Sequence, residues 1–488
     1  MILFRNKRVS LLKHFYLYET KTIKINLMNR VFLLIIMFVS SCYANAQVVR
    51  TVELTKDDDL AALLGNEKYQ IDAIVVNGFL SHANISVLND CKLNGKLREL
   101  DMSGCDVEDG LIPDNSFRGY VSSSAWFTSL KFPRNLNTIG NGAFAYVHVT
   151  ELEFPSTLRV IGPLAFFSAG VLKKVTIPEG TVEIGERAFY CCNFLNEIKL
   201  PSSLKKIGEE AFWGSGNYVR ELKFNEGLES IGENAFCFFN ISELELPSTL
   251  VEIGNGAFSH CEKLSRLKLP ANLERINNET FYKCNNLNEI KWFEKLKVIG
   301  NKAFGKIWMK SLELPDGLTT IGENVFESTV TEKLILPATL NTFAYNAFSL
   351  CTAIKEVYAK SAVPPILDIN GSVVPFPKDA VLYVPVGSRD AYLNTFCRGE
   401  FKEIIETENF PTSIGGVMTG DVTYGVSGKN GAISIANNGN VSVPYYIYTA
   451  DGKLYNNGVA ERGTVTVNAG KGLYVVRIGN STDKVIVK

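Results

Sequence analysis

Residues 207–212 read Ile207-Gly208-Glu209-Glu210-Ala211-Phe212, and this motif or a close variant recurs ten times between residues 139 and 348. The phenylalanines that end the ten motifs are Phe144, Phe166, Phe189, Phe212, Phe236, Phe258, Phe281, Phe304, Phe326 and Phe348. Successive phenylalanines are 22 to 24 residues apart. A near-constant period of this length is typical of a solenoid, in which each period is one supersecondary unit stacked on the next. Such proteins usually present a surface rather than run a reaction.

A triplet in which two apolar residues flank a middle one precedes each turn motif. The triplets begin at residues 152, 175, 198, 222, 244, 267, 290, 312, 334 and 357, and prolines follow seven of them. This alternation predicts short strands with one buried face, and proline ends a strand because it has no N–H to donate. We expect the motif glycine to permit a tight turn and the phenylalanine to enter the interior. One unit cannot bury its apolar side alone, so the sequence predicts stacked units with a parallel strand ladder.

The segments on either side of the repeats have the character of caps, a linker and a second domain. Residues 48–94 are expected to form an N-terminal cap, with a helix at 60–64 and a strand at 71–76. Ile112 to Phe117 keeps the spacing of the turn motif and is counted as repeat one, with 97–102 as its strand. A strand at 381–385 and a helix near 390–396 would close the solenoid, which spans 95–406 with its C-terminal cap. Residues 407–420 are predicted to be a linker, and short apolar runs in 421–488 predict a small antiparallel β-sandwich.

The repeated pattern, in which Ile, Gly, Ala and Phe recur together in fixed register, resembles the BspA-type leucine-rich repeat family. The resemblance covers about residues 95–406 and implies a right-handed α/β-type leucine-rich repeat solenoid with a parallel strand ladder. It also implies a secreted or cell-surface protein of a host-associated bacterium that adheres to surface components. Two repeats depart from the pattern, with Asn277 in place of glycine and Phe343-Ala344 in place of Ile-Gly. We expect these departures to distort local turns without ending the stack.

The C-terminal region resembles a second known module. Its segments 446–453, 472–478 and 484–488 are similar to the C-terminal sorting domain of type IX secretion substrates. The resemblance implies outer-membrane export and attachment at the cell surface. An unrelated small β-domain that packs or binds is the alternative interpretation.

The N-terminus has the pattern of an export signal within a leader spanning residues 1–46. In residues 28–46 a nine-residue apolar run, Val31 to Val39, follows Arg30 and precedes Ala44-Asn45-Ala46, a small-x-small cleavage signal. We expect cleavage after Ala46, with lipidation at Cys42 as the alternative, and we interpret residues 1–27 as an upstream extension before the true start. Both routes place the protein outside the cytoplasm, either secreted or on the outer-membrane exterior.

Composition and motifs exclude several classes of function. The net charge of -1 gives no basic field for phosphate neutralisation, so nucleic acid is not expected as a partner. His82, His148 and His260 lie apart, and the chain has no Walker loop, GxSxG or Rossmann fingerprint. We therefore predict no enzyme activity, no cofactor and no metal site.

Cysteine positions favour packing over cross-linking. Cys192, Cys261, Cys284 and Cys351 each follow a repeat phenylalanine by three residues, so they share one structural position. Free cysteine there would behave as a small buried hydrophobe. Whether Cys91 and Cys105 pair as a disulfide is left open.

The solvent side of the predicted ladder is the candidate binding surface. Lysines at its middle positions, such as Lys199, lie two residues from glutamates, so the charges cancel locally. This pattern favours either a solubilising lattice of ion pairs or a groove that orients a protein ligand. The ligand-contact patch predicted near its C-terminal end consists of Tyr345, Ile335, Tyr358, Lys291 and Glu313. The primary hypothesis is a monomeric adhesin or interaction scaffold for extracellular proteins or glycans. The second is a carbohydrate-binding accessory protein of a glycan-uptake system, in which Trp126, Trp213 or Trp308 stacks on sugars.

Overall fold

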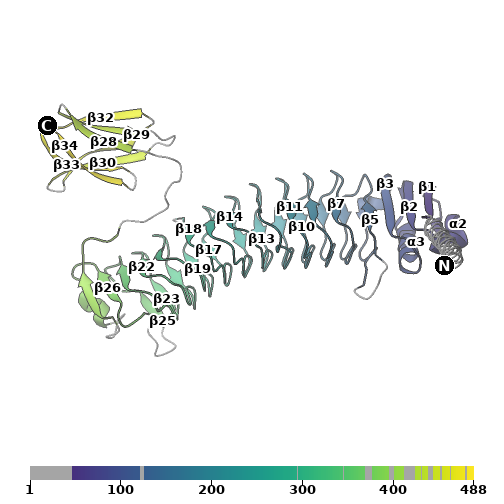
Figure 1. Ribbon diagram of the computed structural model, residues 1–488, viewed down its shortest axis with the longest axis horizontal. Helices are drawn as coiled ribbons and strands as arrows, with labels where there is room; N and C mark the ends of the chain where they lie inside the picture. The colour runs from purple at the N-terminus through teal and green to yellow at the C-terminus, as the bar shows by residue number, and fades with distance from the viewer. Residues whose placement is uncertain are drawn as a thin grey trace, which may run out of the picture.

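The computed structural model shows a long stack of repeats with a cap at each end (Figure 1). The residues it describes are 47–120, 126–293, 295–344, 346–368, 376–394, 401–411, 424–429, 431–437, 443–450, 453–461, 463–478 and 481–487. The predicted leader, cleavage site and lipidation site, as well as Tyr345, lie outside these residues. Two separate hydrophobic cores are present, one running through the solenoid and its caps and one in the C-terminal region.

The N-terminal cap is a parallel sheet covered by short helices. Its elements are β1 (Val49–Leu54), α2 (Leu60–Leu64), η1 (Gly65–Tyr69), β2 (Ala73–Leu80), α3 (His82–Leu93), β3 (Glu99–Val107) and η2 (Glu108–Gly110). The strand order β1-β2-β3-β5 continues into the repeats through β5 (Ser129–Lys131). Asp59 and Ser81 cap the two α-helices by accepting hydrogen bonds from the backbone N–H groups of Ala61 and Asn84. The helix predicted at 60–64 is confirmed, whereas α3 was not anticipated.

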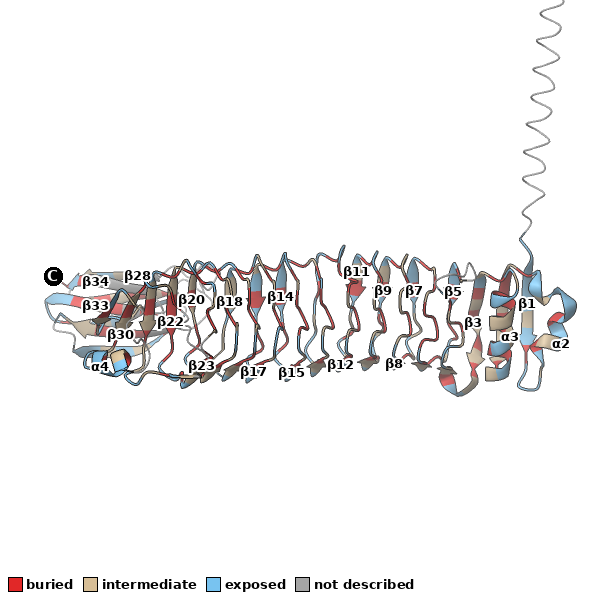
Figure 2. Cartoon of the chain, turned by 90° about the horizontal axis from the view of Figure 1, so that it is seen from below, coloured by how far each residue is buried: buried red, intermediate tan, exposed pale blue. Residues whose placement is uncertain are grey.

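Two parallel ladders, rather than the single one predicted, run along different sides of the stack (Figure 2). The first contains β7 (Glu151–Glu153), β9 (Lys174–Thr176), β11 (Glu197–Lys199), β14 (Glu243–Glu245), β16 (Arg266–Lys268), β18 (Glu289–Lys291), β20 (Ser311–Glu313), β22 (Lys333–Leu336) and β24 (Glu356–Ala359). These strands begin one residue before the predicted triplets. The second ladder contains β4 (Leu111–Ile112), β6 (Thr138–Ile139), β8 (Val160–Ile161), β10 (Glu183–Ile184), β12 (Lys206–Ile207), β13 (Ser230–Ile231), β15 (Glu252–Ile253), β17 (Arg275–Ile276), β19 (Val298–Ile299), β21 (Thr320–Ile321), β23 (Thr342–Ala344) and β25 (Ile366–Asp368). In the described repeats, turns connect the two ladders.

The motif phenylalanines form one buried column through the solenoid. Ten consecutive ring pairs, from Phe117–Phe144 to Phe326–Phe348, stack with centroids 5.1 to 5.9 Å apart and ring planes within 22°. Phe376 extends the column at 5.6 Å from Phe348, and Phe401 lies 5.2 Å beyond Phe376. The prediction of a continuous apolar interior is confirmed, and Phe117 belongs to it as repeat one.

The motif glycine has a different role from the one predicted. Gly185, Gly208 and Gly232 do not have a positive φ; instead, a Cβ on each would lie 2.5 to 2.6 Å from backbone atoms of the preceding repeat. The Gly208 N–H donates to the carbonyl of Ile184 at 2.8 Å, so close approach is what the absent side chain permits. The left-handed residues of the turn lie two positions before and after the phenylalanine, as at Arg187 and Cys191 around Phe189.

The repeat that lacks this glycine shows why the position matters. At Asn277 the side-chain Nδ2 donates a hydrogen bond to the Ile253 carbonyl at 2.7 Å. In most other repeats, the equivalent carbonyl accepts a hydrogen bond from the N–H of the motif glycine. The second ladder is interrupted here, because β15 and β17 belong to different sheets. The ring column nevertheless continues, with Phe258 and Phe281 5.8 Å apart. The prediction that this departure distorts the turn without ending the stack is confirmed.

The C-terminal cap adds two parallel strands to the first ladder. β26 (Val381–Val384) pairs with β24, and β27 (Glu403–Glu406) pairs with β26. The short helix α4 (Arg389–Tyr392) lies where a helix was predicted near residue 390. Its Tyr392 is buried and donates a hydrogen bond to the Ser361 carbonyl at 2.8 Å. The cap therefore covers the last rings of the column.

The C-terminal region consists of two antiparallel sheets, as predicted. One contains β28 (Tyr424–Lys429), β29 (Ala432–Asn437) and β32 (Gly463–Asn468); the other contains β31 (Leu454–Ala460), β30 (Val443–Thr449), β33 (Gly472–Ile478) and β34 (Ser481–Val487). Both contribute to one core, with Ile435 from the first sheet and Ile447 and Val476 from the second. β28 and β34 approach closely, since a Cβ on Gly428 would lie 2.5 Å from the Ile486 carbonyl oxygen.

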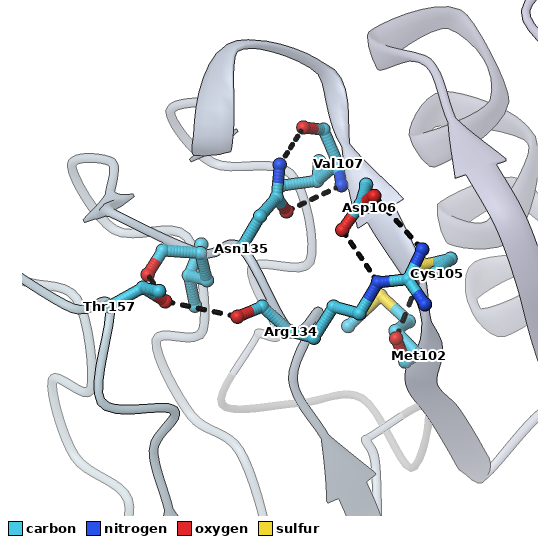
Figure 3. Close-up of polar contacts among 8 residues, drawn as sticks. Met102, Cys105, Asp106, Val107, Arg134, Asn135 and Thr157 are labelled. Carbon is cyan, nitrogen blue, oxygen red and sulfur yellow. Dashed lines mark hydrogen bonds and ion pairs between the residues drawn. The ribbon is translucent and has the colours of Figure 1, made fainter.

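Hydrogen bonds from polar side chains connect the N-terminal cap to the first repeats (Figure 3). Arg134 donates two hydrogen bonds to Asp106 at 2.8 and 2.9 Å, and Asn135 bonds both the N–H and the carbonyl of Val107. Thr157 then donates to the Arg134 carbonyl at 3.1 Å. The end of β3 is thereby joined to the following turns one repeat at a time.

A buried lysine makes a second connection at this junction. Lys92 of α3 is fully buried, and its Nζ donates to the carbonyls of Phe117 and Arg118 at 2.7 and 2.9 Å. Desolvation, with a smaller contribution from Arg98, lowers the pKa of Lys92 to about 7. A neutral amine still has two N–H groups, which matches the two carbonyls.

We expect the stability contribution of Lys92 to rise with pH. Between the folded pKa of about 7 and the higher pKa of the unfolded chain, the unfolded state binds more protons, so raising the pH favours folding. Relative to the Lys92→Met variant, the wild type should gain thermal stability from pH 7 to pH 10, measured by circular dichroism melts. Lys96→Met, at an exposed position, is the control. Parallel stability profiles for wild type and Lys92→Met would contradict the proposed titration.

The eight described cysteines are all free, including Cys91 and Cys105, so the open question of that disulfide is answered. The four cysteines at the shared repeat position are buried, and each thiol donates to the carbonyl of a phenylalanine in the preceding repeat at 2.9 to 3.5 Å. Ser215 fills the same position and makes the equivalent bond to Phe189. The predicted packing role is confirmed.

These thiols should resist alkylation in the folded protein. Burial raises the pKa of Cys192 to about 12 and that of Cys351 to about 11, which removes the reactive thiolate at neutral pH. Iodoacetamide at pH 8 is expected to label them only after denaturation, as read by peptide mass spectrometry. The half-buried neighbour Cys191 is the internal control and should react first. Rapid native labelling of Cys192 would contradict the packing described.

Candidate binding surface

The solvent face of the first ladder is a mixed-charge surface. In most of its strands the central residue is buried and the two flanking residues are exposed or half-buried, as at Glu151 and Glu153 around Leu152. Ion pairs join neighbouring positions, with Lys131 2.8 Å from Asp101 and Lys199 2.8 Å from Glu197. Exposed pairs of this kind contribute only about 0 to 1 kcal/mol each. Their main effect is to fix an alternating pattern of charge on a rigid face.

A shallow depression of about 420 Å³ lies over β14, β16 and β18 on this face. It is lined by Glu243, Leu244, Glu245, Arg266, Leu267, Lys268, Glu289 and Lys291. Arg266 pairs with Glu243 and Lys268 with Glu245 across adjacent strands. Three acidic and three basic side chains therefore balance within the depression, which suits a ligand carrying both signs of charge.

The predicted contact patch is corrected at Ile335, which was expected to be exposed but is only 1% exposed. It lies on β22 between Glu313 of β20 and Tyr358 of β24. Lys360, which follows β24, reaches past β22 to Glu313 at 3.1 Å and to Asp316 at 3.6 Å. The Lys360 side chain therefore spans the strand that carries Ile335, and Glu313 is occupied in a structural ion pair.

Tyr358 remains a candidate and has a partner that the sequence analysis missed. Its ring stacks on Tyr383 of β26, with centroids 4.3 Å apart and planes 6° apart, and Lys333 Nζ lies 4.8 Å from its centroid. Burial, with smaller contributions led by Glu356, raises the pKa of Tyr358 to about 12. The register Tyr358↔Tyr383 makes the two tyrosines neighbours on one face, a relation that required the unknown pairing of β24 with β26.

Among the described members of the predicted patch, Lys291 lies apart from Glu313, Ile335 and Tyr358, which occupy paired positions on adjacent strands. Lys291 is exposed on β18, which belongs to a different sheet from β20, and Tyr345 lies outside the described residues. The three tryptophans proposed to bind sugars are also separate. Trp126 stacks on His148 at 3.8 Å and Trp213 on Tyr190 at 4.8 Å, whereas Trp308 is 59% exposed.

The described residues lack two features, a cluster of potential metal ligands and a membrane-spanning helix. Within those residues, no group of three or more His, Cys, Asp or Glu side chains could hold a metal ion. No helix in the described parts of the chain combines the length and apolar character needed to cross a bilayer.

Comparison with known families identifies the repeats. The profile of the BspA type leucine rich repeat region (6 copies) matches residues 111–219, 215–331 and 275–368, which together cover just over half of the 488 residues. The chain belongs to the BspA type leucine-rich repeat family. This family is defined by a repeat region. No curated protein matches the sequence.

Solved structures of similar repeat proteins cover large parts of this family member. A leucine-rich repeat protein from Bacteroides ovatus is 20% identical, with 64% of this chain and 87% of that chain covered and a TM-score of 0.43. The pneumococcal vaccine antigen PcpA is also 20% identical, with 56% and 85% covered and a TM-score of 0.32. A leucine rich cell surface protein from Faecalibacterium prausnitzii is 21% identical, with 49% and 86% covered and a TM-score of 0.26.

Proposed function

We propose that this BspA-type protein is an exported interaction scaffold that acts as an adhesin, binding a protein or glycan on a host or bacterial surface. The observation that carries the proposal is the mixed-charge first ladder, held in fixed register by the phenylalanine column. Rigid repeated strands supply a broad contact area without a loss of backbone entropy on binding. The depression around Arg266 and Lys268 is the proposed centre of contact, with Lys291 at its edge.

Export is part of the same proposal. An apolar run at 31–39 and the small residues before Gln47 support a cleaved signal, with lipidation at Cys42 as the alternative. The antiparallel C-terminal region would then be the sorting module that directs outer-membrane passage. Mass spectrometry of the mature protein should find an N-terminus at Gln47 or a lipid on Cys42. Retention of residues 1–46 without modification would contradict export by either route.

Binding is tested with the full mature chain on an array of extracellular matrix proteins and glycans. We expect at least one specific ligand, whose affinity falls at least tenfold in the Arg266→Glu/Lys268→Glu variant because the charge pattern is reversed. The matched control is Lys205→Glu/Lys206→Glu, which reverses two exposed charges at the second ladder. An array without signal, or equal losses in both variants, would count against the proposed contact surface.

The second candidate function is that of a carbohydrate-binding accessory protein in a glycan-uptake system. Exposed aromatic side chains such as Trp308 are the observation in its favour. Quenching of tryptophan fluorescence by oligosaccharides would support it.

A further inference from the structure

Two adjacent repeats carry an exposed aromatic pair that no core or ladder contact requires. Phe194 and Tyr218 are 51% and 52% exposed, and their rings lie 6.0 Å apart with planes only 9° apart. The residue after each ring, Leu195 or Val219, is fully buried, so the rings occupy equivalent positions. At the same position in the flanking repeats the chain has Val171 and Asn240. Non-aromatic residues therefore bound the pair on both sides, although the same position carries the stacked Trp126 and His148 and the exposed Trp308 in other repeats.

An extra residue in the second of these repeats accompanies the pair. The spacing from Phe212 to Phe236 is 24 residues, and the triplet that begins at Leu222 forms no strand in the described chain. Gly214 has a φ of +68°, and a Cβ on Gly216 would lie 2.3 Å from the ring of Phe239. Both glycines thus permit the longer turn that brings Tyr218 level with Phe194.

Free amide groups precede both rings. Asn193 and Asn217 are exposed, and among the described residues their side-chain amides make no hydrogen bond with the protein. Each repeat thus presents the same sequence of amide, aromatic ring and buried aliphatic residue. A second aromatic row lies on these repeats, where Tyr190 and Trp213 stack at 4.8 Å.

We propose that Phe194 and Tyr218, with Asn193 and Asn217, form a carbohydrate-binding site. The C–H face of a sugar ring packs on an exposed aromatic ring, and the amides can donate to and accept from its hydroxyl groups. The small size of the site favours a sugar over a protein. Two half-exposed rings offer about 200 Å² of aromatic surface, whereas a stable protein interface buries about 800 Å² on each partner.

This inference rests on the proposed binding function and deepens it by naming a ligand class and a location away from the charged ladder. The probes are cellohexaose, N-acetylchitohexaose and mannohexaose, titrated into the full mature chain by calorimetry. We expect at least one to bind, and the Phe194→Ala/Tyr218→Ala variant to bind it at least tenfold more weakly. Asn193→Ala/Asn217→Ala should weaken binding about threefold or more through loss of polar contacts. Tyr120→Ala, which removes an exposed aromatic that belongs to neither proposed site, should change the affinity less than twofold.

The outcomes separate this site from the ladder face. No binding of any of the three probes by the wild type, or full affinity in the Phe194→Ala/Tyr218→Ala variant, would overturn the sugar site. Loss of a protein ligand instead of a sugar in that variant would also overturn it. The Arg266→Glu/Lys268→Glu variant should keep sugar affinity. If a protein ligand binds the ladder while all three sugars fail, this inference fails alone; if neither class binds, both proposals fail.

Discussion

Replacing Phe212 with alanine is expected to be among the most destabilising single changes in the solenoid. The ring is fully buried and stacks on Phe189 at 5.1 Å and on Phe236 at 5.4 Å. Truncation of a buried phenylalanine costs about 3 to 5 kcal/mol, because the transfer free energy is lost and a cavity remains. Here the cavity also interrupts the column, so both neighbouring repeats lose a partner. We expect a large fall in the urea midpoint and faster amide exchange in the repeats of Phe189 and Phe236.

The control for this experiment is Phe194→Ala in the adjacent repeat. That ring is 51% exposed and lies outside the column, so its removal should change the free energy of unfolding by less than about 1 kcal/mol. Similar losses in the two variants would show that ring burial is not what stabilises the stack.

Gly208→Ala is the second change with a large expected effect, although it adds a single carbon atom. The new Cβ would lie 2.5 Å from the Glu186 nitrogen and 2.6 Å from the Gly185 carbonyl carbon. Both are backbone atoms, so relief requires the two repeats to separate and lengthens the hydrogen bond from Gly208 to Ile184. Overpacking and a weakened buried hydrogen bond together suggest a loss of about 3 kcal/mol. Urea unfolding measures the loss directly.

Gly170→Ala is the matched control for the alanine substitution. Its Cβ would meet only the Ser168 carbonyl oxygen, at 3.8 Å, and its φ is not positive. We expect a change within about 0.5 kcal/mol. Equal tolerance of alanine at both sites would refute close backbone approach as the reason for glycine.

The repeat architecture could be predicted because a period of 22 to 24 residues carries strong information about stacking. Phe117 was placed in repeat one by spacing alone, and the cysteine position was recognised as packing because it recurred. The second ladder was not predicted, since strands of two residues such as Lys206–Ile207 are too short to show an alternating pattern. The role of Gly208 was assigned to turn geometry because a sequence does not reveal how near the next layer of backbone lies.

The surface was less accessible to prediction than the core. In its repeat, Ile335 occupies a position that is exposed in most other repeats. The Lys360 side chain crosses its strand to reach Glu313 two strands away, and a sequence pattern does not encode that contact. Tyr383 belongs to the cap, outside the regular period, so its stacking on Tyr358 had no repeat signal. Phe194 and Tyr218 lie at equivalent positions because the second repeat has one extra residue before Tyr218. A regular period does not predict this extra residue. Local exceptions to the period, rather than the period itself, determine the distinctive surface features.

Asn277, which stands where most other repeats have the motif glycine, indicates how such chains can change in length. An amide side chain reproduces the hydrogen bond that the glycine N–H makes elsewhere, so neighbouring layers tolerate an imperfect unit and keep the ring column aligned. Because most contacts of a layer are with its two neighbours, with the Lys360–Glu313 pair as an exception, duplication or deletion of one whole unit would leave most remaining interfaces intact. Gene rearrangement in steps of one repeat can therefore extend or shorten the exposed ladder by about 4.8 Å at a time without redesign of the interior.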